Sequence, residues 1–148
     1  MKNAEEKTRI SVEEYRNTVL QNKPHILIDV RTEPEMEICS LSDSINIPLE
    51  EIESEASLKK IIKAISKINN ATDSLKSNKT LNFRHIVVVC RRGNDSQVAS
   101  KILKQRLNDA TKPHMVPNQN SDEEYVVQDI IGGLHSWAKR IDSYFPIY

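Results

Sequence analysis

The residues best suited to chemistry in this sequence lie in one short segment, CRRGNDS, which runs from Cys90 to Ser96. The cysteine follows an apolar run at residues 86–89, and a helical pattern begins soon after it. A thiolate is a strong nucleophile, and nearby cations or backbone N–H donors make a thiol more reactive. The segment is therefore a candidate site for nucleophilic chemistry.

The surrounding pattern indicates how Cys90 is positioned. Catalytic groups in a parallel α/β sheet gather at the carboxyl ends of the strands, and Cys90 falls at such an end. Residues 91–95 are predicted to form a tight loop, in which Gly93 permits backbone conformations that other residues avoid. A helix starting near Ser96 or Gln97 would let the loop amides and first helical N–H groups converge on a negative charge. The alternative is an ordinary core thiol, because free cysteines are often buried.

Strand and helix patterns alternate along the chain. Short runs rich in Ile, Leu and Val predict strands at residues 25–30 (HILIDV), 44–49 (SINIPL), 85–90 (HIVVVC) and from 125 onward. A capping box formed by Ser11 and Glu14 predicts a helix over residues 12–20. A second helix is expected to start at Thr32, with Pro34 in its first turn. The alternation predicts an α/β domain with a mostly parallel central sheet flanked by helices.

Three later helices show apolar faces that are expected to be buried. The first face consists of Leu58, Ile61, Ile62, Ile65 and Ile68. The second consists of Val98, Ala99, Ile102, Leu103 and Leu107. The third consists of Leu134, Trp137, Ala138 and Ile141, after a Gly132-Gly133 turn. Residues 1–148 are predicted to form one domain, with a flexible segment at 1–8 and surface loops at 69–84 and 110–124.

Composition excludes several classes of function. Lys plus Arg and Asp plus Glu both number 21, so no surplus of positive charge predicts direct nucleic-acid binding. The longest apolar runs are too short to span a bilayer, so no membrane association is expected. The N-terminus lacks the apolar core of a secretory signal. Two cysteines, Cys39 and Cys90, form no disulfide framework, which favours a reducing, cytoplasmic location. The four histidines show no metal-ligand spacing, so no metal site is predicted.

The motif CRRGNDS after an apolar strand, with LIDVR at residues 27–31 and SINIPL at 44–49, resembles the rhodanese family of sulfurtransferases. The run GNDSQ and the terminal DIIGGLHSWAKRIDSYFPIY narrow this likeness. They resemble the C-terminal rhodanese domain of the adenylyltransferase–sulfurtransferases that activate ubiquitin-like sulfur carriers. The resemblance covers roughly residues 9–148, interrupted by the two polar loops.

This resemblance implies a single rhodanese domain in which Cys90 carries a persulfide. The backbone amides of a cradle would then surround the outer sulfur; its residues are Arg91, Arg92, Gly93, Asn94, Asp95 and Ser96. A cysteine desulfurase or another persulfide donor would load Cys90. The persulfide would attack the adenylated C-terminal glycine of a ubiquitin-like carrier, for tRNA wobble-uridine thiolation, molybdopterin synthesis or both.

In that family an adenylating domain supplies ATP chemistry and carries zinc. This sequence holds no glycine-rich phosphate loop, and two cysteines cannot build a four-cysteine zinc site. No cofactor is therefore expected in this chain, which is interpreted as a fragment or a stand-alone member. Its partners would be the carrier, the persulfide donor and the adenylating domain.

Individual residues near the cysteine leave alternatives open. The Asp95 carboxylate would repel an anionic donor such as thiosulfate and so favour protein persulfides, or it would cap the helix near Ser96. One of Arg91 and Arg92 is expected to stabilise the sulfur anion. Asp29 and Arg31 are expected at the same sheet edge, more as a structural ion pair than as chemical groups. An ordinary thiol is the favoured interpretation of Cys39.

Two rival functions remain at this stage. A dual-specificity phosphatase on the same fold needs an arginine six residues after the cysteine, and here that position is Ser96. A non-catalytic rhodanese-like binding module is the other rival. The presence of Cys90 argues against it, because such modules often lack the cysteine.

Overall fold

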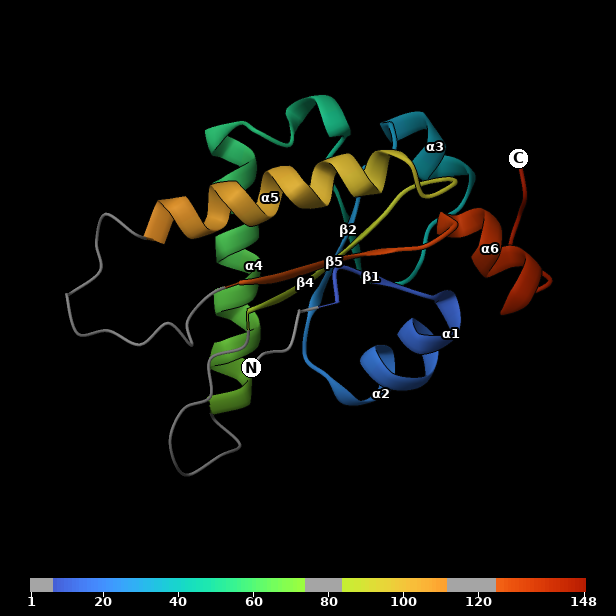
Figure 1. Cartoon of the computed structure of the whole chain (residues 1–148), viewed down its shortest axis with the longest axis horizontal. Coiled ribbons are helices and arrows are strands. Elements are labelled where there is room, and N and C mark those ends of the chain that lie inside the picture. The colour runs from blue at the N-terminus through green and yellow to red at the C-terminus, as the bar shows by residue number, and fades with distance from the viewer. Residues whose placement is uncertain (1–6, 74–83, 112–124) are drawn as a thin grey trace.

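The computed structural model describes residues 7–73, 84–111 and 125–148, which build a sheet flanked by helices (Figure 1). The strands are β1 (Arg9–Ile10), β2 (Ile26–Asp29), β3 (Ser44–Asn46), β4 (His85–Val89) and β5 (Val126–Ile130). The helices are α1 (Val12–Glu14), the π-helical η1 (Tyr15–Val19), α2 (Leu20–Asn22), α3 (Glu33–Ile38), the 3-10 helix η2 (Leu49–Glu51), α4 (Glu55–Asp73), α5 (Asp95–Thr111) and α6 (Gly133–Arg140). The α/β class predicted from the alternating pattern is confirmed.

The sheet has the strand order β1-β5-β4-β2-β3, and every described pair is parallel. The central strand is therefore β4, with β5 on one side and β2 on the other. Because β4 is covered on both faces, its four residues after His85 are all buried, which explains the uninterrupted apolar run. The parallel arrangement places the carboxyl ends of β2, β4 and β5 at one edge, and Cys90 follows the central strand there.

Two apolar clusters lie on opposite faces of the sheet. The face covered by α4 and α5 holds Ile28, Val88 and Cys90 together with Ile61 and Leu103. The other face is covered by the α1–η1–α2 helix and by α6, whose Leu134 and Trp137 pack against Leu27 and Val87 among others. The alternation of neighbouring strand residues between the two clusters is the ordinary two-residue period of a strand.

Most predicted elements are present, with shifts at their ends. The helix predicted at 12–20 is continuous to Asn22, and α3 begins after Thr32 with a Thr32–Glu35 capping box. In α4 the predicted apolar face is buried or partly buried. In α5 the prediction is wrong for Val98, whose side chain is half exposed. The buried face instead runs through Ser96, Ala99, Leu103 and Leu107, and Val98 lies about 100° around the helix from Ala99, on the exposed side.

The predicted surface loops need correction at their edges. Helix α4 continues to Asp73 and α5 to Thr111, so residues 69–73 and 110–111 are helical rather than loop. A helix can run past its apolar stripe because its backbone hydrogen bonds do not depend on apolar side chains. Arg84 precedes β4, and segments 74–83 and 112–124 lie outside the described residues.

The N-terminal segment predicted to be flexible is described only at Lys7 and Thr8. The Lys7 carbonyl accepts a hydrogen bond from the Gln128 amide, and the Thr8 carbonyl accepts one from the Asp129 N–H. These two residues are therefore hydrogen-bonded to β5, and the rest of that segment lies outside the described residues. Within the described residues no helix has the length and apolar character needed to cross a bilayer.

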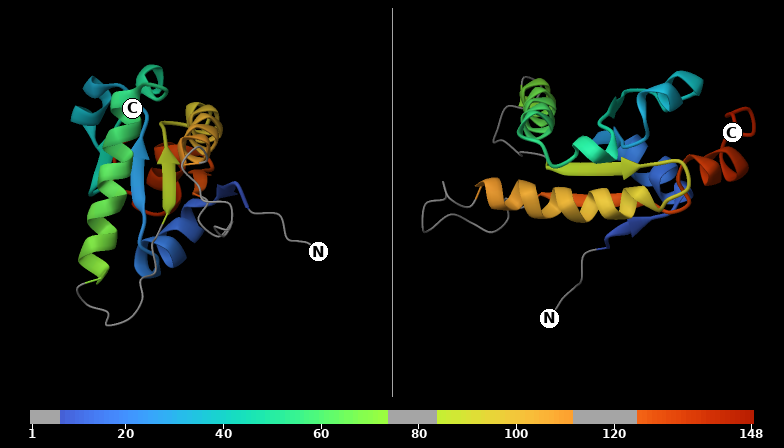
Figure 2. Two further views of the ribbon diagram at one scale, coloured as in Figure 1. Left: turned by 90° about the vertical axis from the view of Figure 1, so that its left-hand side faces the viewer. Right: turned by 90° about the horizontal axis from the view of Figure 1, so that it is seen from above.

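The C-terminal segment after α6 lies at the same end of the molecule as α3 (Figures 1 and 2). Two contacts fix it there. The Tyr148 hydroxyl accepts a hydrogen bond from Arg31 and donates one to Glu35, both at 2.8 Å. The end of the described chain thus packs next to the carboxyl edge of the sheet, where Cys90 lies.

Candidate active site

Cys90 is the residue immediately after β4, and only 4% of its surface is exposed. Two backbone amides donate hydrogen bonds to its sulfur. The Gly93 N–H lies 3.0 Å from Sγ, and the Ser96 N–H lies 3.3 Å from it. Ser96 lies in the first turn of α5, so the positive end of that helix also faces the sulfur. A sulfur anion at this position is stabilised by two donors and a helix dipole.

Glycines allow the loop to curl around the sulfur. Gly93 has a φ of +95°, and a Cβ there would come within 2.7 Å of the Gly132 backbone nitrogen. Gly133 has a φ of +59°, and a Cβ there would overlap the Cys90 carbonyl oxygen. The two segments therefore touch backbone to backbone, which side chains would prevent.

The start of α6 fixes the carbonyl side of the same loop. The Leu134 N–H donates to the Cys90 carbonyl at 2.9 Å, and the His135 N–H donates to the Arg91 carbonyl at 2.9 Å. These bonds satisfy two N–H groups that a helix start leaves without intrahelical partners. With its carbonyls held by α6, the loop presents N–H groups on the opposite side, toward the sulfur.

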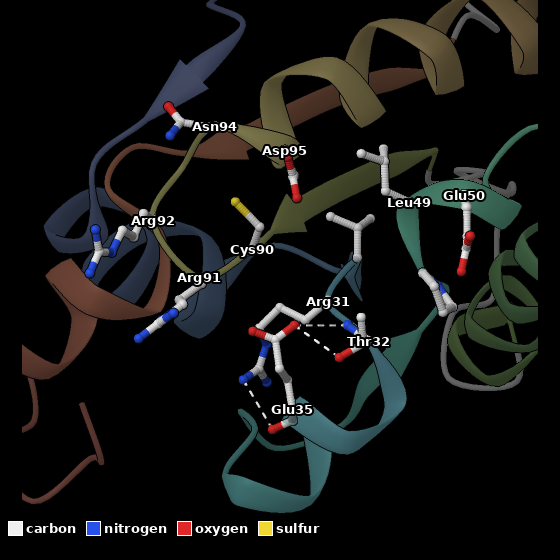
Figure 3. Close-up of a pocket in the computed structure, with 12 residues that line it drawn as sticks. Arg31, Thr32, Glu35, Leu49, Glu50, Cys90, Arg91, Arg92, Asn94 and Asp95 are labelled. Carbon is white, nitrogen blue, oxygen red and sulfur yellow. Dashed lines mark hydrogen bonds between the residues drawn. The ribbon is translucent and has the colours of Figure 1, made fainter. Parts of the chain in front are cut away.

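Cys90 opens onto a cavity of about 560 Å³ (Figure 3). Its walls come from three places: the start of α3, the residues around η2, and the cysteine loop. The volume falls in the range of about 300–1,000 Å³ that is usual for ligand sites. Carboxylates and guanidinium groups both line it; these residues are Glu35, Glu50, Asp95, Arg31, Arg91 and Arg92. The cavity is thus charged but not dominated by one sign.

Asp95 is the first residue of α5, so the helix-capping position before it belongs to Asn94. The expectation that Asp95 caps a helix starting near Ser96 is therefore wrong by one position. A carboxylate in the first helical turn is still favourable with the helix dipole. Asp95 also lines the cavity, and in Figure 3 its carboxylate points toward Cys90.

The two arginines of the loop differ in their contacts. The Arg91 guanidinium stacks on the Tyr148 ring, 4.2 Å from the ring centroid. Arg92 lines the cavity with an exposed side chain. In Figure 3 both side chains extend away from the Cys90 sulfur. In this geometry the sulfur is held by main-chain amides, while Arg91 joins the loop to the C-terminal segment.

Asp29 and Arg31 form the buried ion pair that was expected from the sequence. The Arg31 Nη2 lies 2.8 Å from the Asp29 carboxylate, and both side chains are at most 1% exposed. Burial alone would lower the pKa of Arg31, but hydrogen bonds from its guanidinium to Asp29 and Tyr148 raise it above its usual value. The same guanidinium donates to the Cys39 carbonyl at 2.7 Å. Arg31 therefore organises the α3 side of the cavity.

The glutamate in this cluster, Glu35, has a lowered pKa. Burial would raise it, but hydrogen bonds from the Thr32 backbone N–H, the Tyr148 hydroxyl and the Thr32 side chain lower it, with help from the charge of Arg31. The carboxylate is thus held in its ionised form beside the cavity.

A second buried carboxylate was missed by the sequence analysis. Asp129, in β5, is 1% exposed and accepts a hydrogen bond from the Ser96 hydroxyl at 2.8 Å. It also pairs with Arg9 of β1, whose Nε lies 3.0 Å from Oδ1. A carboxylate inside an apolar strand is the signal that could have revealed it, because buried carboxylates require partners. The identity of the partner depends on the β1–β5 pairing, which aligns Arg9 with Asp129.

Comparisons with known proteins agree with this geometry. The sequence model of the family described as the rhodanese-like domain matches residues 11–140 of this chain. The chain is similar to proteins named adenylyltransferase and sulfurtransferase MOCS3. It is 40% identical to the one from Drosophila sechellia over 140 residues, which cover 95% of this chain and 24% of that protein. It is 35% identical to the one from Xenopus laevis, over 95% of this chain and 27% of that protein. The chain spans about a quarter of the length of these relatives.

Solved structures share the fold at low sequence identity. A rhodanese-related protein from Thermoplasma volcanium is 20% identical with a TM-score of 0.53, over 95% of this chain and 97% of that one. A yeast protein tyrosine phosphatase of the rhodanese family is 10% identical with a TM-score of 0.60, over 93% of this chain and 88% of that one. Since the domain match covers most of the sequence and the relatives align along nearly all of it, the chain belongs to the rhodanese family.

Proposed function

We propose that this chain is a sulfurtransferase domain in which Cys90 carries a persulfide. The observation that carries the proposal is the pair of amides on one sulfur, the Gly93 N–H at 3.0 Å and the Ser96 N–H at 3.3 Å. Donors placed in this way stabilise a sulfur anion without a metal or a cofactor. The names of the relatives, which include sulfurtransferase, support the same reaction class.

The proposed loading step is a thiol–persulfide exchange. The Cys90 thiolate attacks the outer sulfur of a donor persulfide such as that of a cysteine desulfurase. The S–S bond of the donor breaks, and the donor leaves as a thiolate. The transferred sulfur then lies on Cys90 as a persulfide anion within reach of the loop amides.

The proposed second step transfers this sulfur to the adenylated C-terminal glycine of a ubiquitin-like carrier. The outer persulfide sulfur attacks the acyl carbon, the bond to AMP breaks, and an acyl disulfide joins the carrier to Cys90. A thiol reductant cleaves its S–S bond and leaves a thiocarboxylate on the carrier. An adenylating domain, which would hold ATP and zinc, must supply the activated glycine. We place this reaction in the cytoplasm, in tRNA wobble-uridine thiolation, molybdopterin synthesis or both.

Intact mass spectrometry tests the central claim. After incubation with thiosulfate or with a sulfur-loaded cysteine desulfurase, we expect the protein to gain the mass of one sulfur atom, and dithiothreitol to remove it. Cys90→Ala should abolish the gain. Cys39→Ala is the matched control and should still gain the sulfur, because Cys39 lies at the C-terminal end of α3 and not in the amide cradle. Absence of the gain with every donor would favour the non-catalytic binding module.

We further propose that Asp95 selects against anionic donors. Its carboxylate is exposed and lines the cavity next to Cys90, where it repels an anion such as thiosulfate. Asp95→Thr is expected to raise thiosulfate:cyanide transfer by roughly tenfold, which corresponds to about 1.4 kcal/mol of removed repulsion. Transfer that stays unchanged or falls would contradict this role.

The phosphatase alternative requires an arginine side chain six residues after the cysteine. The residue there is Ser96, and its hydroxyl donates to Asp129 rather than into the cavity. The likeness to the yeast phosphatase is one of fold. We therefore expect no turnover of p-nitrophenyl phosphate, and measurable Cys90-dependent turnover would revive this reading.

A further inference from the structure

A hydrogen-bond network centred on the buried Asp129 carboxylate contacts the cysteine loop, and its residues do not line the 560 Å³ cavity. The Asp129 carboxylate accepts hydrogen bonds from the Ser96 hydroxyl at 2.8 Å and from two nitrogens of Arg9 at 3.0 and 3.1 Å. The same Arg9 guanidinium donates to the Gly93 carbonyl at 3.1 Å. The network therefore ends on Gly93 and Ser96, two residues far from Arg9 in sequence.

These two ends are the residues whose amides bind the Cys90 sulfur. Arg9 holds Gly93 by its carbonyl, and Asp129 holds Ser96 by its hydroxyl. The Gln97 side chain adds a second bond to the Gly93 carbonyl at 2.9 Å. These hydrogen bonds restrict the backbone conformation of Gly93 and Ser96, and so keep their N–H groups directed at the Cys90 sulfur. Residues that support a site in this way set its geometry without touching the substrate.

We propose that Arg9 and Asp129 are positioning residues that aim the Gly93 and Ser96 amides at the sulfur of Cys90. The part of this proposal that concerns a bound persulfide rests on the proposed function. The part that concerns the Cys90 thiolate does not. The two parts can fail separately, because thiolate reactivity is measurable even if no sulfur is ever transferred.

The distribution of charge favours this role over mere support of the fold. Asp129 is buried, whereas about a third of the Arg9 side chain is exposed, on the short edge strand β1. An arginine serving only to neutralise Asp129 has no need to bond the Gly93 carbonyl as well. The Arg9 guanidinium bonds both the Asp129 carboxylate, which holds Ser96, and the Gly93 carbonyl, so one hydrogen-bond network links the two amide donors.

The first test measures alkylation of Cys90 by iodoacetamide at pH 7, in a Cys39→Ala background so that only Cys90 reports. Arg9→Ala is expected to slow alkylation by about tenfold, the effect of losing a well-aimed charge-assisted hydrogen bond. Mere loosening of the fold predicts the opposite sign, because Cys90 is 4% exposed and becomes more accessible. An unchanged or faster rate therefore overturns the proposal.

Chemical rescue separates positioning from general damage. A cavity of about 250 Å³ next to this network is lined by Thr8, Arg9, Gln97 and Ser100 among others, so it gives a small cation access to the site of the lost guanidinium. In Arg9→Ala, about 20–50 mM guanidinium chloride should restore most of the alkylation rate. This concentration is on the order of a hundredth of the multimolar range that unfolds proteins, so it should not denature the variant. Sodium chloride at the same concentration should not restore the rate. Equal effects of the two salts would overturn the proposal.

A control for the loss of an arginine comes from an exposed ion pair elsewhere in the molecule. Arg140 pairs with Glu13 at 2.8 Å, at the end of α6 remote from the Cys90 loop. Arg140→Ala should leave the alkylation rate unchanged and show no response to guanidinium. If Arg140→Ala slowed alkylation as much as Arg9→Ala, the effect would not belong to the network, and the proposal would fail.

A double-mutant cycle covers the case in which Arg9→Ala does not fold. If Asp129 acts through the Ser96 hydroxyl, Ser96→Ala and Asp129→Ala should not be additive in the logarithm of the alkylation rate. The double variant should then be about as slow as the slower single variant. Additive effects would overturn the proposal. Sulfur loading measured by mass in the same variants reports separately on the persulfide.

Discussion

Two aspartate–arginine pairs lie at the carboxyl edge of this sheet, and they differ in almost every other respect. Asp29 and Arg31 are two residues apart at the end of β2, and both side chains are at most 1% exposed. Asp129 and Arg9 are separated by 120 residues, and the arginine is 34% exposed. An aspartate–arginine pair therefore occurs twice. The Asp29–Arg31 pair is local in sequence and fully buried, whereas the Asp129–Arg9 pair is distant in sequence and has a partly exposed arginine.

The difference shows how one kind of interaction serves two purposes. Arg31 also donates hydrogen bonds to the Cys39 carbonyl and the Tyr148 hydroxyl. The Asp29–Arg31 pair therefore connects α3 and the C-terminal segment to the sheet. The Arg9 Nη2 group also donates to the Gly93 carbonyl, so this pair reaches the sulfur cradle. We expect loss of the first pair to reduce stability most and loss of the second to reduce reactivity most.

The largest expected effect is that of Arg31→Met. It leaves the Asp29 carboxylate buried without its charge partner, which costs about 3–5 kcal/mol of unfolding free energy. Arg9→Met is the comparison and is expected to cost less, about 1–2 kcal/mol, because water reaches the partly exposed arginine position and the Ser96 hydroxyl still donates to the buried Asp129 carboxylate. Urea unfolding measures both. Equal losses would remove the distinction between the two pairs.

Gly133→Ala should come next in size, because it disturbs the cradle without touching either pair. The residue has a φ of +59°, and the added Cβ would overlap the Cys90 carbonyl oxygen. Strain of this kind costs about 1–3 kcal/mol. Unfolding of His135→Ala, in the same helix, provides the control and should change by less than about 0.5 kcal/mol. A Gly133→Ala variant as stable as wild type would mean that the α6 contact does not shape the loop.

A smaller loss of stability is expected for Tyr148→Phe, which tests whether the Asp29–Arg31 pair stabilises the fold through the C-terminal segment. The change removes the hydroxyl between Arg31 and Glu35 but keeps the ring on which Arg91 stacks. Loss of these hydrogen bonds should reduce the unfolding free energy by about 1 kcal/mol. Cys90 alkylation should remain unchanged in this variant. A large change in alkylation would show that the two pairs are coupled.

The smallest expected effect is a pH dependence at Glu35. Its pKa is lower in the folded protein than its ordinary value of 4.5, so it contributes stability above that value. This contribution should disappear as the pH falls through the lowered pKa of the folded state. The difference in unfolding free energy between wild type and Glu35→Gln should therefore shrink between about pH 5 and pH 3. A difference that stays constant over this range would contradict the prediction.

Much of the fold follows from local patterns. The run at residues 86–89 predicted a strand, and the structure places it at the centre of the sheet. The stripe from Leu58 to Ile68 predicted the buried face of α4, although not its extension to Asp73. Val98 was assigned to the wrong face, since it lies about 100° around the helix from Ala99 and so falls outside the buried stripe through Ala99, Leu103 and Leu107.

In the candidate site too, some features follow from the local sequence and others depend on the tertiary structure. Sequence alone placed a cysteine, a glycine and a helix start within seven residues, and the short range of the chain made their convergence on one sulfur predictable. It also predicted the Asp29–Arg31 pair, because the two residues share a strand end. It gave no means of joining Arg9 to Asp129 or Tyr148 to Arg91. Those contacts exist only because parallel strand pairing and the packing of the C-terminal segment bring distant residues together. Local chemistry was determined by the sequence, whereas the partners that aim and surround it were decided by the tertiary structure.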